Sequence, residues 1–234
     1  MSGFMAVLSK DLRTEVRTKE VAPSMMLFGL VLVFLLTFAL PPGAGRAPVP
    51  PPEAGAVATR EIAGIFLWIT ILFIGMVGFA RSAALEREGS RIEALVLAPI
   101  DPAGLYAAKA AANFVYLSAM QIVIVPIFIL FFDLRPALSL FGIVPVVILG
   151  NVGLAAVGTL FGTASQYVRM REVLLPLLAF PILLPLILAA SKLTSTLFTT
   201  GGFEGQGRWF VLMAAFDLSI SAIGAVAFEY VIHE

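Results

Sequence analysis

Six long runs of apolar residues, separated by short polar segments, dominate this chain of 234 residues. Each run is long enough for a helix to cross a hydrocarbon core of about 30 Å. A membrane barrel would instead show strands of about ten residues with alternating polarity. The pattern therefore predicts an all-α integral membrane protein with six transmembrane helices. Their expected limits are residues 23–40, 60–80, 104–132, 138–164, 173–190 and 208–230.

Composition leads to the same class. The chain is 60% hydrophobic and 13% charged, with a mean hydropathy of +1.01, and a soluble domain of this length could not bury so much apolar surface. We therefore expect residues 1–234 to form a single membrane domain. Residues 1–22 are too charged for a secretory signal peptide and carry an amphipathic pattern, which predicts a helix lying in the membrane interface. Its apolar side holds Phe4, Val7, Leu8, Leu12 and Val16.

The positions of lysine and arginine predict the orientation of the chain. One side of the membrane would hold Lys10, Arg13, Arg17, Lys19, Arg81, Arg87, Arg91, Lys109, Arg169 and Arg171. The other side would hold Arg46, Arg60, Arg135, Lys192 and Arg208. Ten against five places both termini and residues 81–103 in the cytoplasm. Residues 41–59 and 191–207 then form loops on the opposite side.

A charged segment, residues 81–103, connects the second and third runs. Ser90 and Glu93 have the spacing of a capping box, so a short helix should begin near Arg91. Pro99 ends it, and Asp101 with Pro102 should form the N-cap and first position of the next helix. A short surface helix between two spans is what a transport permease presents to a separate motor subunit. An ordinary cytoplasmic loop lying on the lipid headgroups is the alternative.

Proline and small polar residues mark the outer side. The linker 41–59 is rich in proline and is expected to be a stiff spacer. Pro176, Pro181 and Pro185 should kink the fifth span or break it into pieces. Residues 191–207 are rich in Ser, Thr and Gly and are long enough for a small outer cap, with a re-entrant helix around Leu193–Phe198 as one form of it.

The sequence carries no catalytic or metal-binding motif. It has no phosphate-binding loop, no hydrolase signature, no cysteine and a single histidine, His233 at the C-terminal end. Trp68 and Trp209 stand too far apart to form a tryptophan-rich haem-holding loop. We therefore expect no enzyme activity and no metal or cofactor bound by this chain. Another subunit would supply the energy.

A carboxylate and a series of glycines stand out inside the predicted spans. Asp217 lies about nine residues into the last run, roughly 13 Å along a helix and near mid-membrane. It is either a functional group at a hinge or cargo path, or a structural hydrogen-bond anchor to a neighbouring helix. Small residues also recur along the fourth run, which indicates close helix packing within this chain or against a second membrane subunit. They are Gly150, Gly153, Gly158 and Gly162.

Four stretches in order resemble the haem exporter protein B (CcmB) family, the permeases of cytochrome c maturation system I. They are the charged opening Lys10–Glu20, the segment Leu85–Pro99, the proline-containing run Arg171–Pro185, and Phe216-Asp217 with the ending Phe228–Val231. The resemblance covers nearly the whole chain and is interrupted by the proline-rich linker, which is longer than usual for that family.

The resemblance implies an ABC-2-type permease-like subunit of an ATP-binding-cassette complex in a bacterial inner membrane, with a cytoplasmic coupling helix. ATP would bind a cytoplasmic cassette ATPase, and haem would bind other partners. The implied partners are a Trp-rich haem-handling membrane protein, a small membrane subunit, a periplasmic haem chaperone and membrane lipid, with no nucleic acid. The implied contacts with the ATPase are Glu86, Arg87, Glu88, Gly89, Arg91, Ile92, Glu93 and Leu95.

Two other functions share these features. A general ABC-2-type export permease for a lipid or a drug-like cargo would have the same spans and surface helix. A non-transporting scaffold that only assembles partners would need neither cargo nor hydrolysis. A channel or an intramembrane enzyme is disfavoured, because no span carries a repeated polar face or a cluster of catalytic groups.

Overall fold

The structure is a computed structural model that describes residues 2–18, 20–39, 52–88, 101–132, 134, 139–164 and 171–233. Every regular element in these ranges is a helix. They are α1 (Ser2–Thr18), α2 (Val21–Ala39), α3 (Pro52–Glu88), α5 (Pro102–Phe131), α6 (Ser139–Ala164), α7 (Arg171–Thr200) and α8 (Gly207–His233). Six of them, α2 to α8, are long and apolar enough to cross a membrane. The prediction of an all-α protein with six such helices is confirmed.

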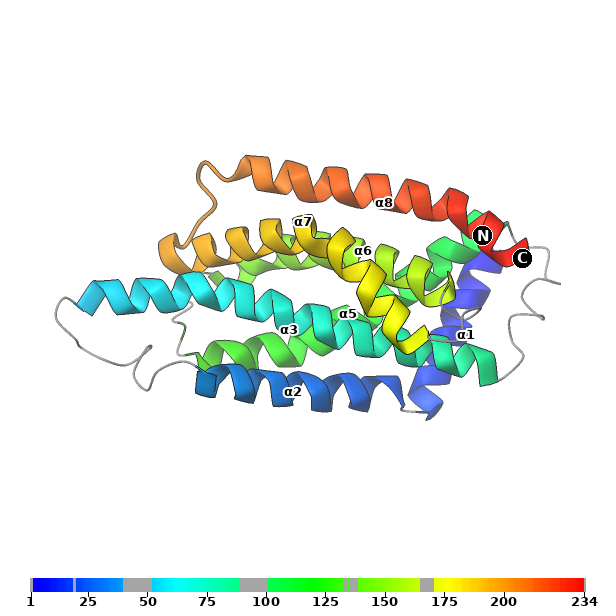
Figure 1. Cartoon of the computed structure of the whole chain (residues 1–234), viewed down its shortest axis with the longest axis horizontal. Coiled ribbons are helices and arrows are strands. Elements are labelled where there is room, and N and C mark those ends of the chain that lie inside the picture. The colour runs from blue at the N-terminus through cyan, green and yellow to red at the C-terminus, as the bar shows by residue number, and fades with distance from the viewer. Residues whose placement is uncertain are drawn as a thin grey trace.

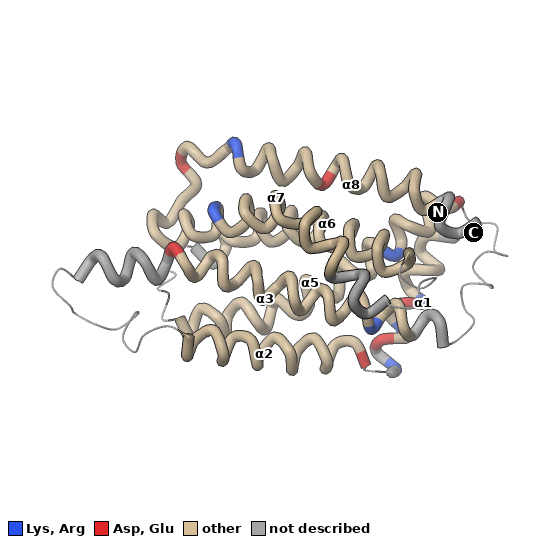
Figure 2. The backbone as a smooth tube through the Cα atoms, viewed as in Figure 1, with Lys and Arg blue, Asp and Glu red and all other residues tan. Residues whose placement is uncertain are grey.

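The six long helices run side by side along the long axis of the molecule, while α1 lies across one end of the bundle (Figure 1). Both chain termini lie at this end, as do the last turn of α3 and the first turn of α5. Charged residues gather toward the two ends of the long helices, with one acidic position midway along α8 (Figure 2). We call the end that carries α1 the α1 end.

Several helices extend beyond their predicted limits. α3 begins at Pro52, inside the predicted linker 41–59, and proline is favoured in the first turn of a helix because its missing N–H is not needed there. It continues through Glu88, inside the predicted coupling segment. The predicted N-cap is confirmed, since the Asp101 carboxylate accepts a hydrogen bond from the Gly104 N–H at 3.3 Å at the start of α5. Residues 89–100, with the predicted capping box and Pro99, lie outside the described residues.

α7 differs most from expectation. It is one helix through Thr200, so residues 193–198 form its last turns rather than a separate re-entrant helix, and only residues 201–206 connect it to α8. Hydroxyl groups here bond back to the preceding turn, as from Thr196 to the Lys192 carbonyl at 2.8 Å, so they satisfy the helix instead of ending it. Gly201, at φ 78°, ends the helix in the left-handed region that glycine adopts readily. The prolines leave α7 continuous, although Figure 1 shows a change of direction in its first half.

Glycine allows the helices to approach closely. The ring of Trp68 on α3 lies directly over Gly150 of α6, and its Nε1–H donates to the Thr194 hydroxyl of α7 at 2.9 Å. Farther along α6, the ring of Phe79 lies over Gly158. A methyl group at either glycine would overlap these rings. The predicted close packing along α6 is confirmed at these positions, and it occurs within this chain.

Candidate functional site

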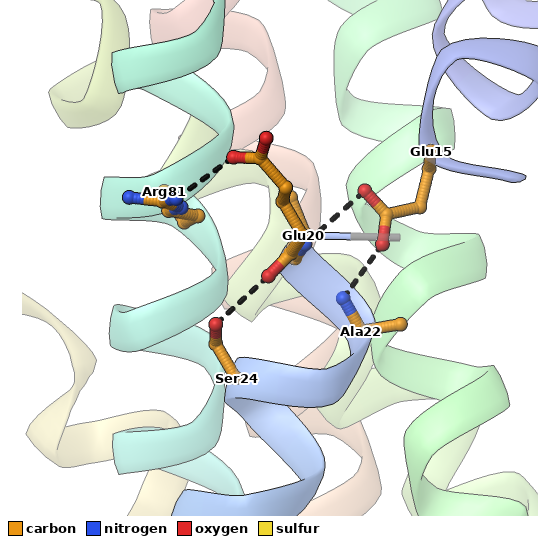
Figure 3. Close-up of polar contacts among 6 residues, drawn as sticks. Glu15, Glu20, Ala22, Ser24 and Arg81 are labelled. Carbon is orange, nitrogen blue, oxygen red and sulfur yellow. Dashed lines mark hydrogen bonds and ion pairs between the residues drawn. The ribbon is translucent and has the colours of Figure 1, made fainter. Parts of the chain in front are cut away.

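The turn between α1 and α2 is held by a buried carboxylate. Glu15, near the end of α1, accepts hydrogen bonds from the backbone N–H groups of Val21 at 3.3 Å and Ala22 at 2.7 Å (Figure 3). These N–H groups open α2 and have no acceptor within their own helix. The negative charge also complements the positive end of the helix dipole. Glu15 therefore caps α2 from α1 and fixes the angle between the two helices.

An ion pair connects this turn to α3. Glu20, the residue before α2, lies 2.7 Å from the Arg81 guanidinium, and its backbone carbonyl accepts from the Ser24 hydroxyl at 2.8 Å (Figure 3). Both charged side chains are substantially exposed, so the pair contributes at most about 1 kcal/mol in water. Its position matters more than its strength, because Arg81 is the first residue of the predicted coupling segment. We call Glu15, Glu20 and Arg81 the elbow cluster.

A second contact attaches α1 to α5. The Tyr116 hydroxyl on α5 donates to the backbone carbonyl of Asp11 at 2.8 Å, and α1 packs along α5. In the sequence, residues 89–100 stand between α3 and α5. α3 is connected to the turn after α1 through the elbow cluster, and α5 is connected to α1 through Tyr116.

A small polar cavity lies beside the elbow cluster, between α1, α3, α5 and α6. Its volume is about 30 Å³, enough for one or two water molecules and far below the several hundred Å³ of a cofactor pocket. Across it, the Asn113 side chain donates to the Thr159 hydroxyl at 2.8 Å, and Lys109 contributes a buried amine. The lining is Asp11, Phe79, Ser82, Ala83, Lys109, Ala112, Asn113, Tyr116, Gly158, Thr159, Gly162 and Thr163.

Metal-binding groups do not gather in the described part of the chain, where no three His, Cys, Asp or Glu side chains come together. Polar side chains within the spans instead bond to each other. The amides of Gln121 on α5 and Asn151 on α6 exchange two hydrogen bonds, at 2.7 and 3.0 Å, and Asn151 also donates to the Ser118 hydroxyl. Such pairs stabilise helix packing in a membrane by about 0.6 kcal/mol on average.

Asp217 behaves differently from these amides. Its side chain is buried against Gly153 of α6. A Cβ atom added to that glycine would lie 2.5 Å from the Asp217 Oδ1 atom. Neither carboxyl oxygen has a hydrogen-bond partner among the described residues. The alternative of a hydrogen-bond anchor to a neighbouring helix therefore has no support in this packing.

The predicted coupling residues are only partly within the described chain. Glu86, Arg87 and Glu88 belong to the last turn of α3, and their side chains lie outside the described residues. Gly89, Arg91, Ile92, Glu93 and Leu95 lie outside them entirely. The interface with an ATPase stays a prediction.

Sequence reasoning missed the elbow cluster. The available signal was local for Glu15 and Glu20, since acidic residues just before an apolar run favour the start of a helix. It was absent for Arg81, which is 61 positions from Glu20 and becomes its neighbour only through the packing of α2 on α3.

These observations define the class of the protein. It is a multi-pass membrane protein with six helices able to cross the bilayer, an amphipathic helix across one end, and an ion pair that connects the turn between α1 and α2 to α3. The sequence model of the CcmB protein family matches residues 2–233, and the chain belongs to that family.

Two curated relatives are similar over most of their length. Heme exporter protein B of Rhodobacter capsulatus is 27% identical over 188 residues, which cover 80% of each chain. Heme exporter protein B of Paracoccus denitrificans is 28% identical over 189 residues, again 80% of each chain. The resemblance found in the sequence motifs is thereby confirmed.

Removal of the Glu15 cap tests how much this member of the elbow cluster contributes to the stability of the protein. We expect Glu15→Ala to lower the free energy of unfolding by about 1 kcal/mol, as for other helix caps, because two N–H groups of α2 lose their acceptor. Glu15→Gln keeps an acceptor and should lose less. Thermal unfolding of the purified protein in detergent measures the difference. Arg13→Ala, an exposed change on the same helix, is the control, and an equal loss in that variant would contradict the capping role.

Proposed function

We propose that this chain is the transmembrane permease subunit of an ATP-binding-cassette complex in cytochrome c biogenesis. It would couple ATP hydrolysis by a cytoplasmic partner to haem export, or to release of a haem-loaded chaperone, at the periplasmic face. Membership of the CcmB family over residues 2–233 carries the proposal, together with the name heme exporter protein B that both relatives bear. The permease itself has no ATPase motif, so the hydrolysing site belongs to a partner.

The arrangement at the α1 end supports a coupling role. α1, both termini and the ends of α3 and α5 all lie there (Figure 1). Five described residues of the predicted cytoplasmic set also belong to this end, namely Lys10, Arg13, Arg17, Arg81 and Lys109. We infer that this end faces the cytoplasm of a bacterial inner membrane. An ATPase that moves the segment 89–100 would displace α3 and α5 directly, and α2 through Glu20 and Arg81.

Release of a chaperone fits the interior better than passage of haem through this chain. The cavity at the α1 end has a volume of only about 30 Å³, and the single histidine of the chain, His233, lies at the C-terminal end. We propose that haem is held by a Trp-rich membrane partner and by the periplasmic chaperone. The small membrane subunit and lipid would cover exposed apolar faces of the bundle.

Affinity purification tests this proposal. Tagged protein is extracted in mild detergent, and the material that accompanies it is identified by mass spectrometry and haem absorbance. We expect a cassette ATPase together with a haem-binding membrane protein. An ATPase without any haem protein would overturn the cytochrome assignment in favour of a general export permease. Absence of an ATPase would overturn both.

A further inference from the structure

Asp217 is a buried carboxyl group that the proposed function does not use. It lies ten residues into α8, roughly 15 Å along the helix, and its side chain is only 6% exposed. Both carboxyl oxygens are inaccessible and lack a hydrogen-bond partner among the described residues. A partner protein could not reach them while α8 keeps this position.

No cation or hydrogen-bond donor of the described residues compensates a negative charge on the carboxyl group. A Cβ atom added to Gly153 on α6 would lie 2.5 Å from the Asp217 Oδ1 atom, 2.6 Å from the Leu186 side chain on α7 and 3.2 Å from the Phe216 ring. The sequence of α6 contains no charged residue. No ion pair to Asp217 is formed within the described part of the chain.

The titratable groups of the helices packed against α8 lie elsewhere. On α5, Lys109 lines the cavity at the α1 end, and the Tyr106 hydroxyl donates to the Ala156 carbonyl beside Gly224. On α7, Lys192 is exposed. Arg208 stands in the first turn of α8. The side chains of Arg171, Glu172, Glu229 and His233 lie outside the described residues.

An ionised carboxylate in this environment would be strongly unfavourable, since no donor or cation of the described residues offsets its desolvation. A neutral acid is tolerated far better, although its hydroxyl remains unpaired. α8 lies at the outside of the bundle, with 22% of its span buried within this chain compared with 67% for α3 and α6. Movement of α8 away from α6 would expose the carboxyl group to water or to a partner.

We propose that Asp217 is a proton-binding group at the contact between α8 and α6, neutral while the two helices are packed and ionised only when α8 moves away. The carboxyl group packs so closely against Gly153 of α6 that even an added methyl group would lie 2.5 Å from its Oδ1 atom, and no lysine or arginine of the described residues pairs with it. Helix separation and proton release would then be one linked event.

Infrared spectroscopy of the protein in lipid vesicles tests this inference. A neutral carboxylic acid and a carboxylate absorb at different frequencies, and labelling aspartate with ¹³C at the carboxyl carbon distinguishes the four aspartates of the chain from its glutamates. At pH 7 we expect a label-sensitive carboxylic acid band. It should persist in Asp101→Asn, which changes an exposed aspartate, and disappear in Asp217→Asn.

Exchange into heavy water gives a second, mutation-free readout. We expect the acid band to shift slowly, because the proton is sealed between α6 and α8. Absence of the label-sensitive acid band at pH 7, or its complete shift on mixing, would overturn the inference even if Asp217→Asn failed to fold. The spectrum is measured on this chain alone, so its result is independent of the proposed function.

Discussion

Gly150→Ala is expected to destabilise the protein strongly, and Gly150→Leu to prevent it from folding into a monodisperse particle. A methyl group at this position overlaps the Trp68 ring, whose three nearest atoms all belong to the six-membered part of the indole. That ring is fully buried and hydrogen-bonded to Thr194, so it cannot move aside cheaply. Overpacking of a filled core costs about 1–3 kcal/mol. For a chain of this size, the melting temperature should fall by several degrees.

Gly104→Ala is the matched control. Gly104 lies in the first turn of α5 with no atom within 4 Å of the added methyl group, so the change should leave stability equal or slightly higher. Melting in detergent, followed by size-exclusion fluorescence, compares the two variants. Trp68→Leu should also reduce the additional cost of Gly150→Ala, because it removes the ring that the methyl group meets. Equal melting temperatures for Gly150→Ala and Gly104→Ala would contradict the packing account.

Reversal of two charges in the coupling segment should have the largest functional effect. We expect Glu88→Lys combined with Glu93→Lys to abolish recovery of the ATPase with the permease, while membrane insertion continues. Like charges placed across an interface cost several kcal/mol, which corresponds to a loss of affinity of roughly 100-fold or more. Added lysine on the cytoplasmic side also agrees with the predicted orientation.

The same change of charge at the other end of the bundle is the control. Glu61→Lys with Glu204→Lys alters exposed residues near the start of the α3 span and in the connection between α7 and α8. This pair should leave recovery of the ATPase and the yield of holo-cytochrome c intact. A normal yield of holo-cytochrome c in the Glu88 and Glu93 double variant would reject the assigned interface.

The six helices were predictable because few backbone structures can span a lipid bilayer. Every backbone group must be paired inside the segment, so the length of an apolar run largely determines a helix. The limits of α7 were harder, since Ser, Thr and Gly after residue 190 are typical of a loop in water. There the hydroxyls of Thr196 and Thr199 bond to their own helix, and Leu193 packs into the core. Local composition alone does not distinguish a loop from a continued helix in this segment.

The candidate site was predictable only where its signals are local. Asp101 and Pro102 lie next to the helix that they start, so their spacing identified the N-cap. Glu20 and Arg81 meet through packing of distant helices, and no spacing rule connects them. The burial of Asp217 could be predicted from its place in an apolar run. Its lack of a hydrogen-bond partner among the described residues could not, because it depends on which face of α8 meets Gly153.

We propose that ATP hydrolysis by a partner ATPase drives release of the haem-loaded chaperone at the opposite face of the membrane, through movement of this chain. The most direct measurement reconstitutes the complete complex in lipid nanodiscs and follows the release of haem-loaded chaperone after ATP is added. We predict prompt release with the intact complex, and none when the ATPase carries a substitution of the lysine in its phosphate-binding loop. Release at the same rate without hydrolysis would contradict the coupling account and favour a scaffold.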